Sequence, residues 1–249
     1  MSIADNLATV RRRIADACAR AGRAPDAITL VAVSKTFGPE LIGQALAAGA
    51  RDFGENYVQE ALPKIAALRP DGSARGQARA GVQWHFIGPL QSNKTAAVAG
   101  HFDWVHGVDR DKLARRLSEQ RPAELPPLNV CVQVNISGEA SKSGVAPGDA
   151  AALCRIVAAL PRLKLRGLMA IPAPAVEKGD SPHFQEDENG DSPRRARYRQ
   201  LREVFESLRR DGLELDTLSA GMSDDLEAAI AEGSTLVRVG TAIFGRRQI

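Results

Sequence analysis

Residues 28–56 read ITLVAVSKTFGPELIGQALAAGARDFGEN, and this stretch decides the fold. Its first run is apolar or β-branched up to Ser34 and Lys35, which is typical of a buried strand. The run PELIGQALAAG that follows has the periodicity of a helix and closes on a glycine. RDFGEN, at residues 51–56, has the composition of a second short strand. A strand, a helix and a strand in this order predict neighbouring parallel strands.

The same alternation continues towards the C-terminus, where six more strand-like runs occur: WHFIGP, DWVHGV, NVCVQVNI, LRGLMAI, DTLSAG and STLVRVG. Helix-period stretches separate most of these runs. Eight strand–helix units in 249 residues match the ~250 residues typical of a closed barrel. We therefore predict a single α/β domain over residues 1–249, a (β/α)8 TIM barrel. An open doubly wound sheet is the alternative if one strand is miscounted.

The barrel is predicted to carry an extra helix before its first strand. Apolar residues recur there at spacings of three and four, and Gly22 is placed to end the helix. These apolar residues are Ile3, Leu7, Val10, Ile14 and Cys18.

Two segments lack any regular pattern. Residues 69–81, RPDGSARGQARAG, are predicted to form a solvated loop. Residues 172–197 carry an acidic run and then a basic cluster, without apolar periodicity, and are longer than an ordinary βα loop. We predict that residues 172–197 form a flexible insertion.

Composition excludes several classes of function. Lys and Arg number 33 against 30 Asp and Glu, so the net charge of +3 predicts no nucleic-acid partner. The three cysteines form no CxxC pair, which fits a reducing compartment and buried thiols. The N-terminal segment is charged throughout, so we expect neither a secretory signal nor a membrane span, and a cytoplasmic protein. His101 and His106 lack the spacing and the partners of a metal site.

Two glycine-containing loops follow the last two predicted strands. In SAGMSDDLEAAIAEG, Gly221 permits close approach of the backbone, and Ser223 or Asp224 can cap the next helix. In VRVGTAIFG, Gly240 and Thr241 supply an amide and a hydroxyl. Barrels often bind phosphate with the loops after strands seven and eight, so we predict one anion site here. Either loop alone could be only a helix cap.

Lys35 stands at the end of the first predicted strand. A lysine at a barrel mouth is partly desolvated, which lowers its pKa and lets its amine attack an aldehyde to form a Schiff base. The alternative is a lysine that extends to water at the rim. A phosphate site diagonally across the mouth favours the first interpretation. An aldehyde that bears a phosphate, such as pyridoxal phosphate (PLP), needs both groups.

For each of three further residues, a role at the cofactor and a purely structural role both remain open. Arg238 could face the pyridine nitrogen or the phosphate of such a cofactor, or form a structural ion pair with Glu55 or Asp52. Asn56 could bond to the ring hydroxyl or imine, or serve only the turn. His85 could line the pocket or be a core histidine.

Seven motifs, in order across almost the whole chain, closely resemble the YggS/PROSC family of PLP homeostasis proteins: AVSKT, FGENYVQE, WHFIGPLQSNK, VNIS with SKSG, RGLMAIP, LSAGMSDDLEAAI and VRVGTAIFG. That family is similar in fold to the barrel domain of alanine racemase. The resemblance therefore implies the barrel and places the Schiff base on Lys35. It also implies that the following residues surround the cofactor, mostly through its phosphate: Asn56, Ser219, Gly221, Met222, Ser223, Arg238, Gly240 and Thr241. The departures are the insertion after RGLMAIP and Ala220, where members often carry a bulkier residue.

The resemblance implies a protein that buffers PLP or delivers it to apo-enzymes, within vitamin B6 homeostasis and without a known turnover. A racemase of this barrel type uses a tyrosine from an extra β domain of its partner subunit. The sequence stops at Ile249 and contains only Tyr57 and Tyr198, so we expect an open, one-sided site. Separately, we expect a monomer rather than a stable oligomer. A PLP-dependent amino-acid racemase and a lysine aldolase acting on phosphosugars remain alternatives.

Overall fold

The computed structural model describes residues 1–68, 81–139, 142–172 and 193–245. Eight parallel strands close into a barrel in chain order, and β8 pairs with β1 to complete the ring. The predicted (β/α)8 fold is therefore confirmed. The strands are β1 (Thr29–Val33), β2 (Asp52–Glu55), β3 (Gln83–Phe86), β4 (Trp104–Val108), β5 (Leu128–Gln133), β6 (Leu163–Met169), β7 (Thr217–Ser219) and β8 (Leu236–Val239).

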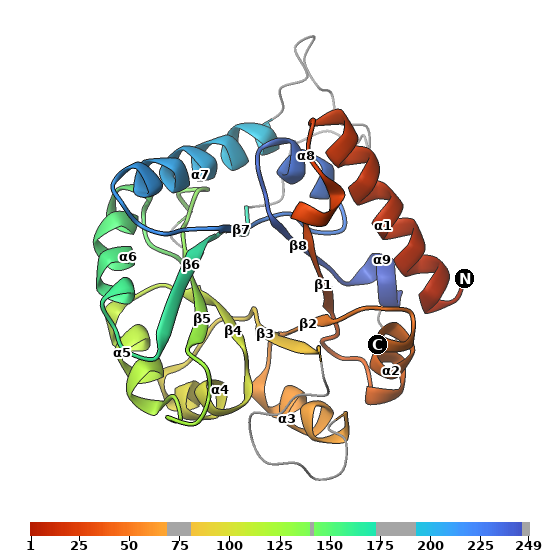
Figure 1. Ribbon diagram of the computed structural model, residues 1–249, viewed down its shortest axis with the longest axis horizontal. Coiled ribbons are helices and arrows are strands. Elements are labelled where there is room, and N and C mark those ends of the chain that lie inside the picture. The colour runs from red at the N-terminus through yellow and green to blue at the C-terminus, as the bar shows by residue number, and fades with distance from the viewer. Residues whose placement is uncertain (69–80, 140–141, 173–192, 246–249) are drawn as a thin grey trace.

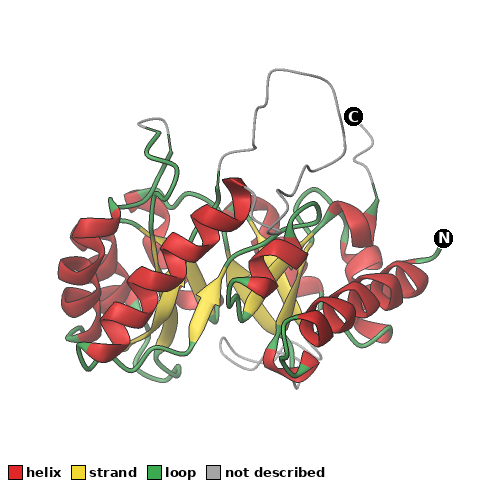
Figure 2. Cartoon of the chain, turned by 90° about the horizontal axis from the view of Figure 1, so that it is seen from above, coloured by secondary structure: helices red, strands yellow, loops and turns green. Residues whose placement is uncertain are grey.

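Helices surround this ring in Figure 1, and Figure 2 shows the strands inside them in a view turned by 90°. The helices are α1 (Ile3–Arg20), α2 (Pro39–Ala47), α3 (Val58–Ala67), α4 (Thr95–His101), α5 (Asp111–Gln120), α6 (Ala150–Ala158), α7 (Pro193–Arg210), α8 (Leu226–Ala231) and α9 (Thr241–Phe244). Short 3-10 turns lie at Pro25–Ala27, Ser92–Lys94 and Pro147–Asp149.

The predicted N-terminal helix is α1. Ser2 and Asp5 form a capping box at its start, which satisfies amide groups that the helix cannot bond itself. Gly22 takes a left-handed conformation with φ of 63° just after the helix, as its position suggested. The apolar residues that predicted this helix are all buried: Ile3, Leu7, Val10, Ile14 and Cys18.

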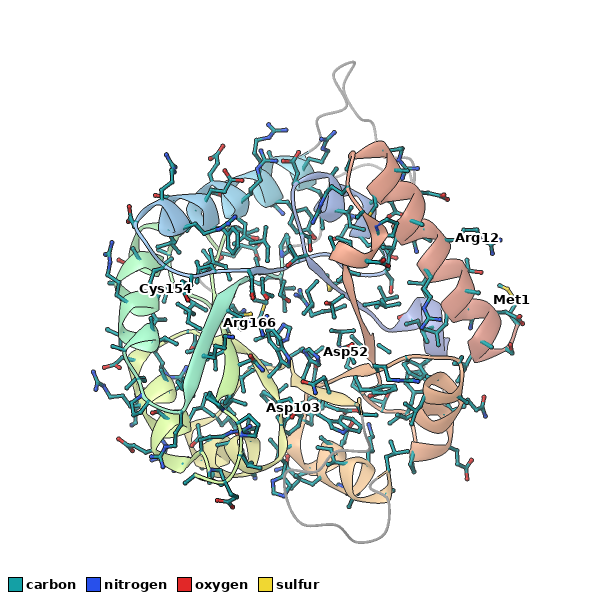
Figure 3. All side chains as sticks on the ribbon, viewed as in Figure 1. Met1, Arg12, Asp52, Asp103, Cys154 and Arg166 are labelled. Atoms are coloured by element: carbon teal, nitrogen blue, oxygen red, sulfur yellow. The ribbon has the colours of Figure 1, made fainter. Side chains whose placement is uncertain are left out.

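The barrel interior differs in character from the layer between strands and helices. Large apolar side chains fill that outer layer, among them Phe53, Trp84, Phe86 and Phe102. Buried polar side chains occur inside the ring, because successive residues of a strand point to opposite faces. They include His85, His106, Ser219 and Arg238. Figure 3 shows Asp52 and Arg166 near the centre of the ring.

The two irregular segments lie largely outside the described residues, which omit 69–80 and 173–192. The end of the predicted insertion differs from expectation, because residues 193–197 belong to the start of α7. The buried side chains of Tyr198, Leu201, Phe205 and Leu208 lie further along the same helix. The apolar stripe that packs α7 onto the barrel begins at Tyr198. The helix itself begins earlier and includes a basic stretch that has no apolar stripe.

All three cysteines are buried free thiols, as predicted. Burial raises the pKa of Cys131 and of Cys154 to about 12. Because the thiolate is the reactive form, we expect iodoacetamide at pH 8 to leave Cys18, Cys131 and Cys154 unmodified in the native protein and to alkylate all three after unfolding. Intact-mass spectrometry reads out the number of adducts. Rapid alkylation of the native chain would contradict this packing.

Within the described residues, every helix is too short or too polar to span a bilayer. The same residues contain no group of three or more His, Cys, Asp or Glu side chains arranged to hold a metal ion.

Candidate functional site

The mouth of the barrel, where the carboxyl ends of the strands meet, contains every predicted site residue. Lys35 follows β1, Asn56 follows β2, and the others lie on or just after β7 and β8. These four strands are consecutive around the closed ring. The residues therefore come from one sector of the mouth. The sequence-based expectation of a phosphate site diagonally across from Lys35 was wrong, since ring closure sets β8 directly beside β1.

Lys35 follows β1 on the side of the strand that faces the barrel interior. Val31 and Val33 face the barrel interior, where their methyl groups would lie 3.0 and 3.5 Å from a Cβ placed on Gly54. Residues two apart on a strand share a face, so Lys35 follows Val33 on the inner side of the mouth. Its side chain is half-buried.

The backbone around Lys35 is tightly held. Ser34 is wholly buried and its amide donates to Gly54 O at 3.0 Å. Its hydroxyl donates to Glu55 Oε1 at 2.6 Å, and Lys64 Nζ donates to Ser34 O at 3.0 Å. On the other side of Lys35, Thr36 is in the left-handed region with φ of 70°, a conformation that costs a non-glycine residue energy. Lys35 thus stands between an anchored residue and a strained one.

Glu55 and Lys64 form a buried ion pair beneath this turn. Lys64 Nζ lies 2.9 Å from Glu55 Oε1 and 3.1 Å from Oε2, with side-chain exposures of 9% and 0%. Burial raises the pKa of Glu55, while hydrogen bonds from Ser34 and Lys64 oppose that rise. We assign an ionised pair, because two donor groups, the Ser34 hydroxyl and the Lys64 ammonium, make three hydrogen bonds to the carboxylate. Sequence analysis missed Lys64, which lies in α3 without any motif to mark it.

Asn56 is positioned by a close contact between two backbones. Its carbonyl oxygen would lie only 2.4 Å from a Cβ on Gly88, and its Cα 2.8 Å away. Only glycine therefore fits at position 88 without a shift of the chain. No hydrogen bond to the Asn56 side chain is formed by any other described residue, which leaves its amide available at the mouth.

We expect Gly88→Ala to destabilise the protein by about 1–3 kcal/mol, because the new methyl group forces the β2 and β3 ends apart. Gly100→Ala is the matched control, since a Cβ there meets nothing within 4 Å. In helix α4 that change should cost nothing and gain up to ~1 kcal/mol. Urea denaturation of both variants measures the difference. Equal stability of the two would contradict the contact at Asn56.

The loop after β7 is organised by Asp225. Met222 N donates to Asp225 Oδ1 at 2.6 Å, and the hydroxyl of Tyr198 donates to Asp225 Oδ2 at 2.8 Å. Gly221 has φ of 94°, and a Cβ on it would lie 2.6 Å from that of Ala229. The prediction that Ser223 or Asp224 caps the next helix was wrong. Asp225 occupies the cap position of α8, and its carboxylate is used inside the loop.

The loop after β8 lies against β1. A Cβ on Gly240 would stand 3.3 Å from both the Cβ and the carbonyl oxygen of Val33, so glycine allows this approach. Among the amide groups of the two loops, those of Ser223, Asp224, Thr241 and Ala242 have no acceptor among the described residues. Unpaired amides that converge at a protein surface favour an anion.

Arg238 points into the barrel with only 4% exposure. One terminal nitrogen donates to Ser219 Oγ at 2.5 Å and the other to Ala170 O at 2.9 Å. Burial lowers the pKa of Arg238. The alternative ion pair with Glu55 or Asp52 is contradicted, because Glu55 binds Lys64 and Asp52 binds His85.

His85 is a core residue and does not lie at the mouth of the barrel. It is wholly buried inside the ring and lies between Asp52 and His106. Sequence analysis did not connect these side chains, because they come from separate strands and approach only when the ring closes.

A separate cavity of about 390 Å³ lies at the base of the barrel, where the strands begin. Asp52, Gln83, Trp104, Arg166 and Asp216 are among its lining residues. The strand ends that carry Lys35 and Gly240 lie at the opposite end of the barrel, so this cavity is not part of the predicted site.

Comparison with known proteins shows the family and the fold of this chain. The family model described as the N-terminal domain of alanine racemase matches residues 4–248. A protein of Pseudomonas aeruginosa named pyridoxal phosphate homeostasis protein is 55% identical over 246 residues, covering 99% of this chain and 96% of its own. The protein of the same name from Escherichia coli K12 is 53% identical over 98% of this chain and 97% of its own. The chain belongs to the family of pyridoxal phosphate homeostasis proteins.

Solved structures agree with this family. PipY of Synechococcus elongatus PCC7942, solved with PLP bound, is 35% identical over 98% of this chain and all of its own, with a TM-score of 0.76. The alanine racemase of Corynebacterium glutamicum is 19% identical with a TM-score of 0.64, which shows a shared fold. The matched region covers 98% of this homeostasis-family chain but only 61% of the racemase chain.

Proposed function

We propose that this chain binds PLP at the mouth of the barrel, anchors it on Lys35, and buffers or delivers it without turning over a substrate. The neighbouring positions of β1 and β8 carry the proposal. Gly240 packs against Val33, two residues before Lys35, so the amine and the unpaired amides of the loop after β8 belong to one sector. The names of the relatives and the PLP bound to PipY support the choice of ligand.

The residues of the mouth fit the chemical groups of PLP. When bound, PLP supplies an aldehyde that joins a primary amine through a C=N bond, with release of one water. Lys35 provides the amine. The amides of Ser223 and Thr241 provide donors for the phosphate oxygens, and Gly221, Met222 and Gly240 shape the loops that hold these amides. Asn56 offers its amide to the ring, and Ser219 holds Arg238 in place.

The environment of Tyr198 favours retention of PLP over catalytic turnover of a substrate. Its hydroxyl donates to Asp225, and burial raises its pKa, with the Asp225 charge acting in the same direction. A buried phenol with a raised pKa is a poor proton acceptor, so it does not supply the second base that racemisation needs. Tyr57, the other tyrosine, is 55% exposed. The proposal includes a cytoplasmic setting, a monomer, and transient contact with apo-enzymes.

Delivery and turnover are separated by two measurements on the loaded protein. We expect a PLP-free apo-enzyme to regain activity when mixed with it, at a rate limited by release from this chain. In deuterated water, we expect no exchange of the α-proton of any amino acid beyond that caused by free PLP. Exchange above that level would establish the racemase alternative, and a sugar trapped on Lys35 by borohydride in PLP-free protein would establish the aldolase.

A further inference from the structure

A line of hydrogen bonds crosses the barrel interior from the base to Arg238. Asp52 Oδ1 lies 3.0 Å from His85 Nε2, and His85 Nδ1 lies 2.9 Å from His106 Nε2. His106 Nδ1 lies 2.8 Å from Ser219 Oγ, which accepts from Arg238 at 2.5 Å. We call these five side chains the Asp52 relay. They come from β2, β3, β4, β7 and β8.

The two ends of the relay determine the direction of every donor. A guanidinium can only donate, and a carboxylate can only accept. Because Ser219 accepts from Arg238, its own hydrogen has one acceptor among the described residues, His106 Nδ1. His106 then donates from Nε2 to His85 Nδ1, and His85 donates from Nε2 to Asp52. Both imidazoles are neutral and carry their hydrogen on Nε2.

Burial agrees with this protonation. His85 and His106 have no exposed surface. Burial holds the pKa of His106 well below its ordinary value, and the nearby Arg238 charge acts in the same direction. A charged imidazole at position 85 would reverse the direction of the chain and leave the Ser219 hydroxyl without an acceptor.

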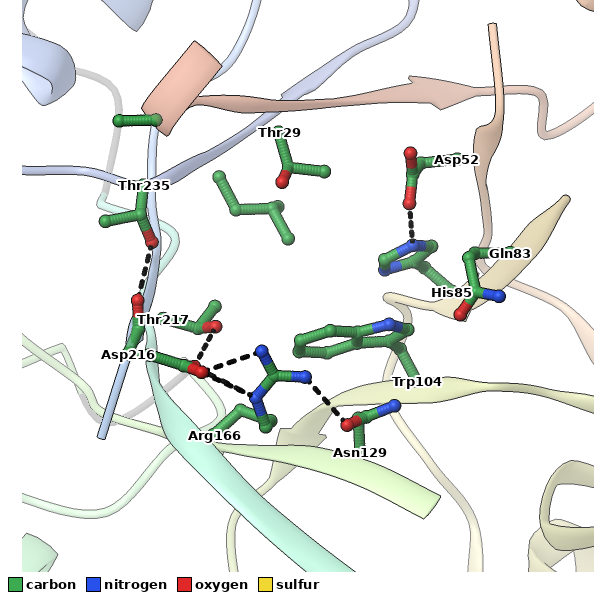
Figure 4. A pocket seen from close by; sticks show the side chains of 12 residues that line it. Thr29, Asp52, Gln83, His85, Trp104, Asn129, Arg166, Asp216, Thr217 and Thr235 are labelled. Carbon is green, nitrogen blue, oxygen red and sulfur yellow. Dashed lines mark hydrogen bonds and ion pairs between the residues drawn. The ribbon is translucent and has the colours of Figure 1, made fainter. Parts of the chain in front are cut away.

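Arg238 is buried, and no described carboxylate forms an ion pair with it, although the charge of Asp225 favours its charged form. Hydrogen bonds that all point the same way polarise one another, so the negative charge of Asp52 favours the guanidinium from across the barrel. The Asp52 side chain is 24% exposed at the basal cavity, so water reaches this end of the relay. Figure 4 shows Asp52 and His85 bonded at this cavity.

We propose that Asp52, His85 and His106 are positioning residues for Arg238, which they hold in place and orient towards bound PLP from the opposite end of the barrel. This inference rests on the proposed function, because it needs PLP at the mouth. The basal end of the barrel then contributes to cofactor retention, in addition to the residues of the mouth.

The first test needs no cofactor. Long-range 1H–15N spectra of the histidine rings in PLP-free protein, assigned with His85→Gln and His106→Gln, should show both rings neutral with the hydrogen on Nε2. An imidazolium at either position, or a hydrogen on Nδ1 of His106, would overturn the relay.

The second test compares two carboxylates of the same cavity. Asp52→Asn keeps an acceptor for His85 but removes the charge, and we expect about fivefold weaker binding of PLP, the difference between a charged and a neutral hydrogen-bond partner. Asp216→Asn is the control, because Asp216 pairs with Arg166 and not with the relay. It should leave PLP binding unchanged.

Equal affinities of the two variants, in a wild-type protein that binds PLP, would overturn the inference and leave the proposed function intact. Failure of the wild-type protein to bind PLP would instead overturn the proposed function, while the histidine spectra would still decide the arrangement of the relay.

Discussion

A Lys35→Ala variant is expected to lose retention of PLP, with an affinity at least about a hundredfold below that of the wild-type protein, equivalent to ~2.7 kcal/mol. The cause is chemical, because no other residue on the inner side of β1 carries an amine that could replace that of Lys35. Lys35→Arg keeps the positive charge but cannot form the C=N bond. It should therefore show the same loss of covalent capture while keeping part of the electrostatic attraction for phosphate.

The measurement is absorbance spectroscopy of titrated PLP, with gel filtration to detect retained cofactor. Lys112→Ala is the control, because Lys112 is an exposed lysine on α5. It should retain PLP as the wild-type protein does. Full retention in both Lys35 variants would mean that a different residue anchors the cofactor.

Lys64→Met should reduce the free energy of unfolding by about 3–5 kcal/mol, because it leaves Glu55 charged and buried without its partner. Such a loss is a large part of the ~5–15 kcal/mol that stabilises a typical protein. The change also frees Ser34 O, which precedes Lys35, so we expect weaker PLP binding as well. Lys112→Met is the exposed control and should change stability by no more than ~0.5 kcal/mol.

The pH dependence of this loss follows from the sign of the shift. Burial raises the pKa of Glu55 above its ordinary value, and removal of Lys64 takes away hydrogen bonds that oppose this rise. The variant therefore regains stability as the carboxyl protonates, and the gap to wild type should shrink as pH falls towards the ordinary pKa of glutamic acid, about 4.3. Adding Glu55→Gln to Lys64→Met should recover part of the loss at neutral pH. An additive double variant would contradict the pairing.

Local patterns predicted the elements of this fold well. The three-and-four spacing in residues 3–18 predicted α1, and apolar runs placed all eight strands. These patterns work because each element buries one face, and the burial of one face imposes a regular spacing of apolar residues that are close in sequence. The limits of α7 were less predictable, since residues 193–197 carry three arginines and no apolar stripe, and join the helix only by continuing it backwards from Tyr198.

Contacts between distant residues could not be read in the same way. The Glu55–Lys64 pair depends on how α3 packs against β2. The Asp52 relay depends on which strands become neighbours and on the register between them. Sequence did place Asp52, Glu55 and His85 among residues of interest, but the alternative that it left open for Arg238, an ion pair with Glu55 or Asp52, was wrong. The neighbouring positions of Lys35 and Gly240 likewise appear only when β8 pairs with β1.

The central claim is that the Lys35 amine and the loops after β7 and β8 hold one molecule of PLP. Borohydride reduction of the PLP-loaded wild-type protein, followed by trypsin and mass spectrometry, tests it most directly. We predict a reduced pyridoxyl phosphate group on the peptide spanning residues 24–51, uncleaved at Lys35. An adduct confined to other lysines, with residues 24–35 cleaved and unmodified, would contradict the account.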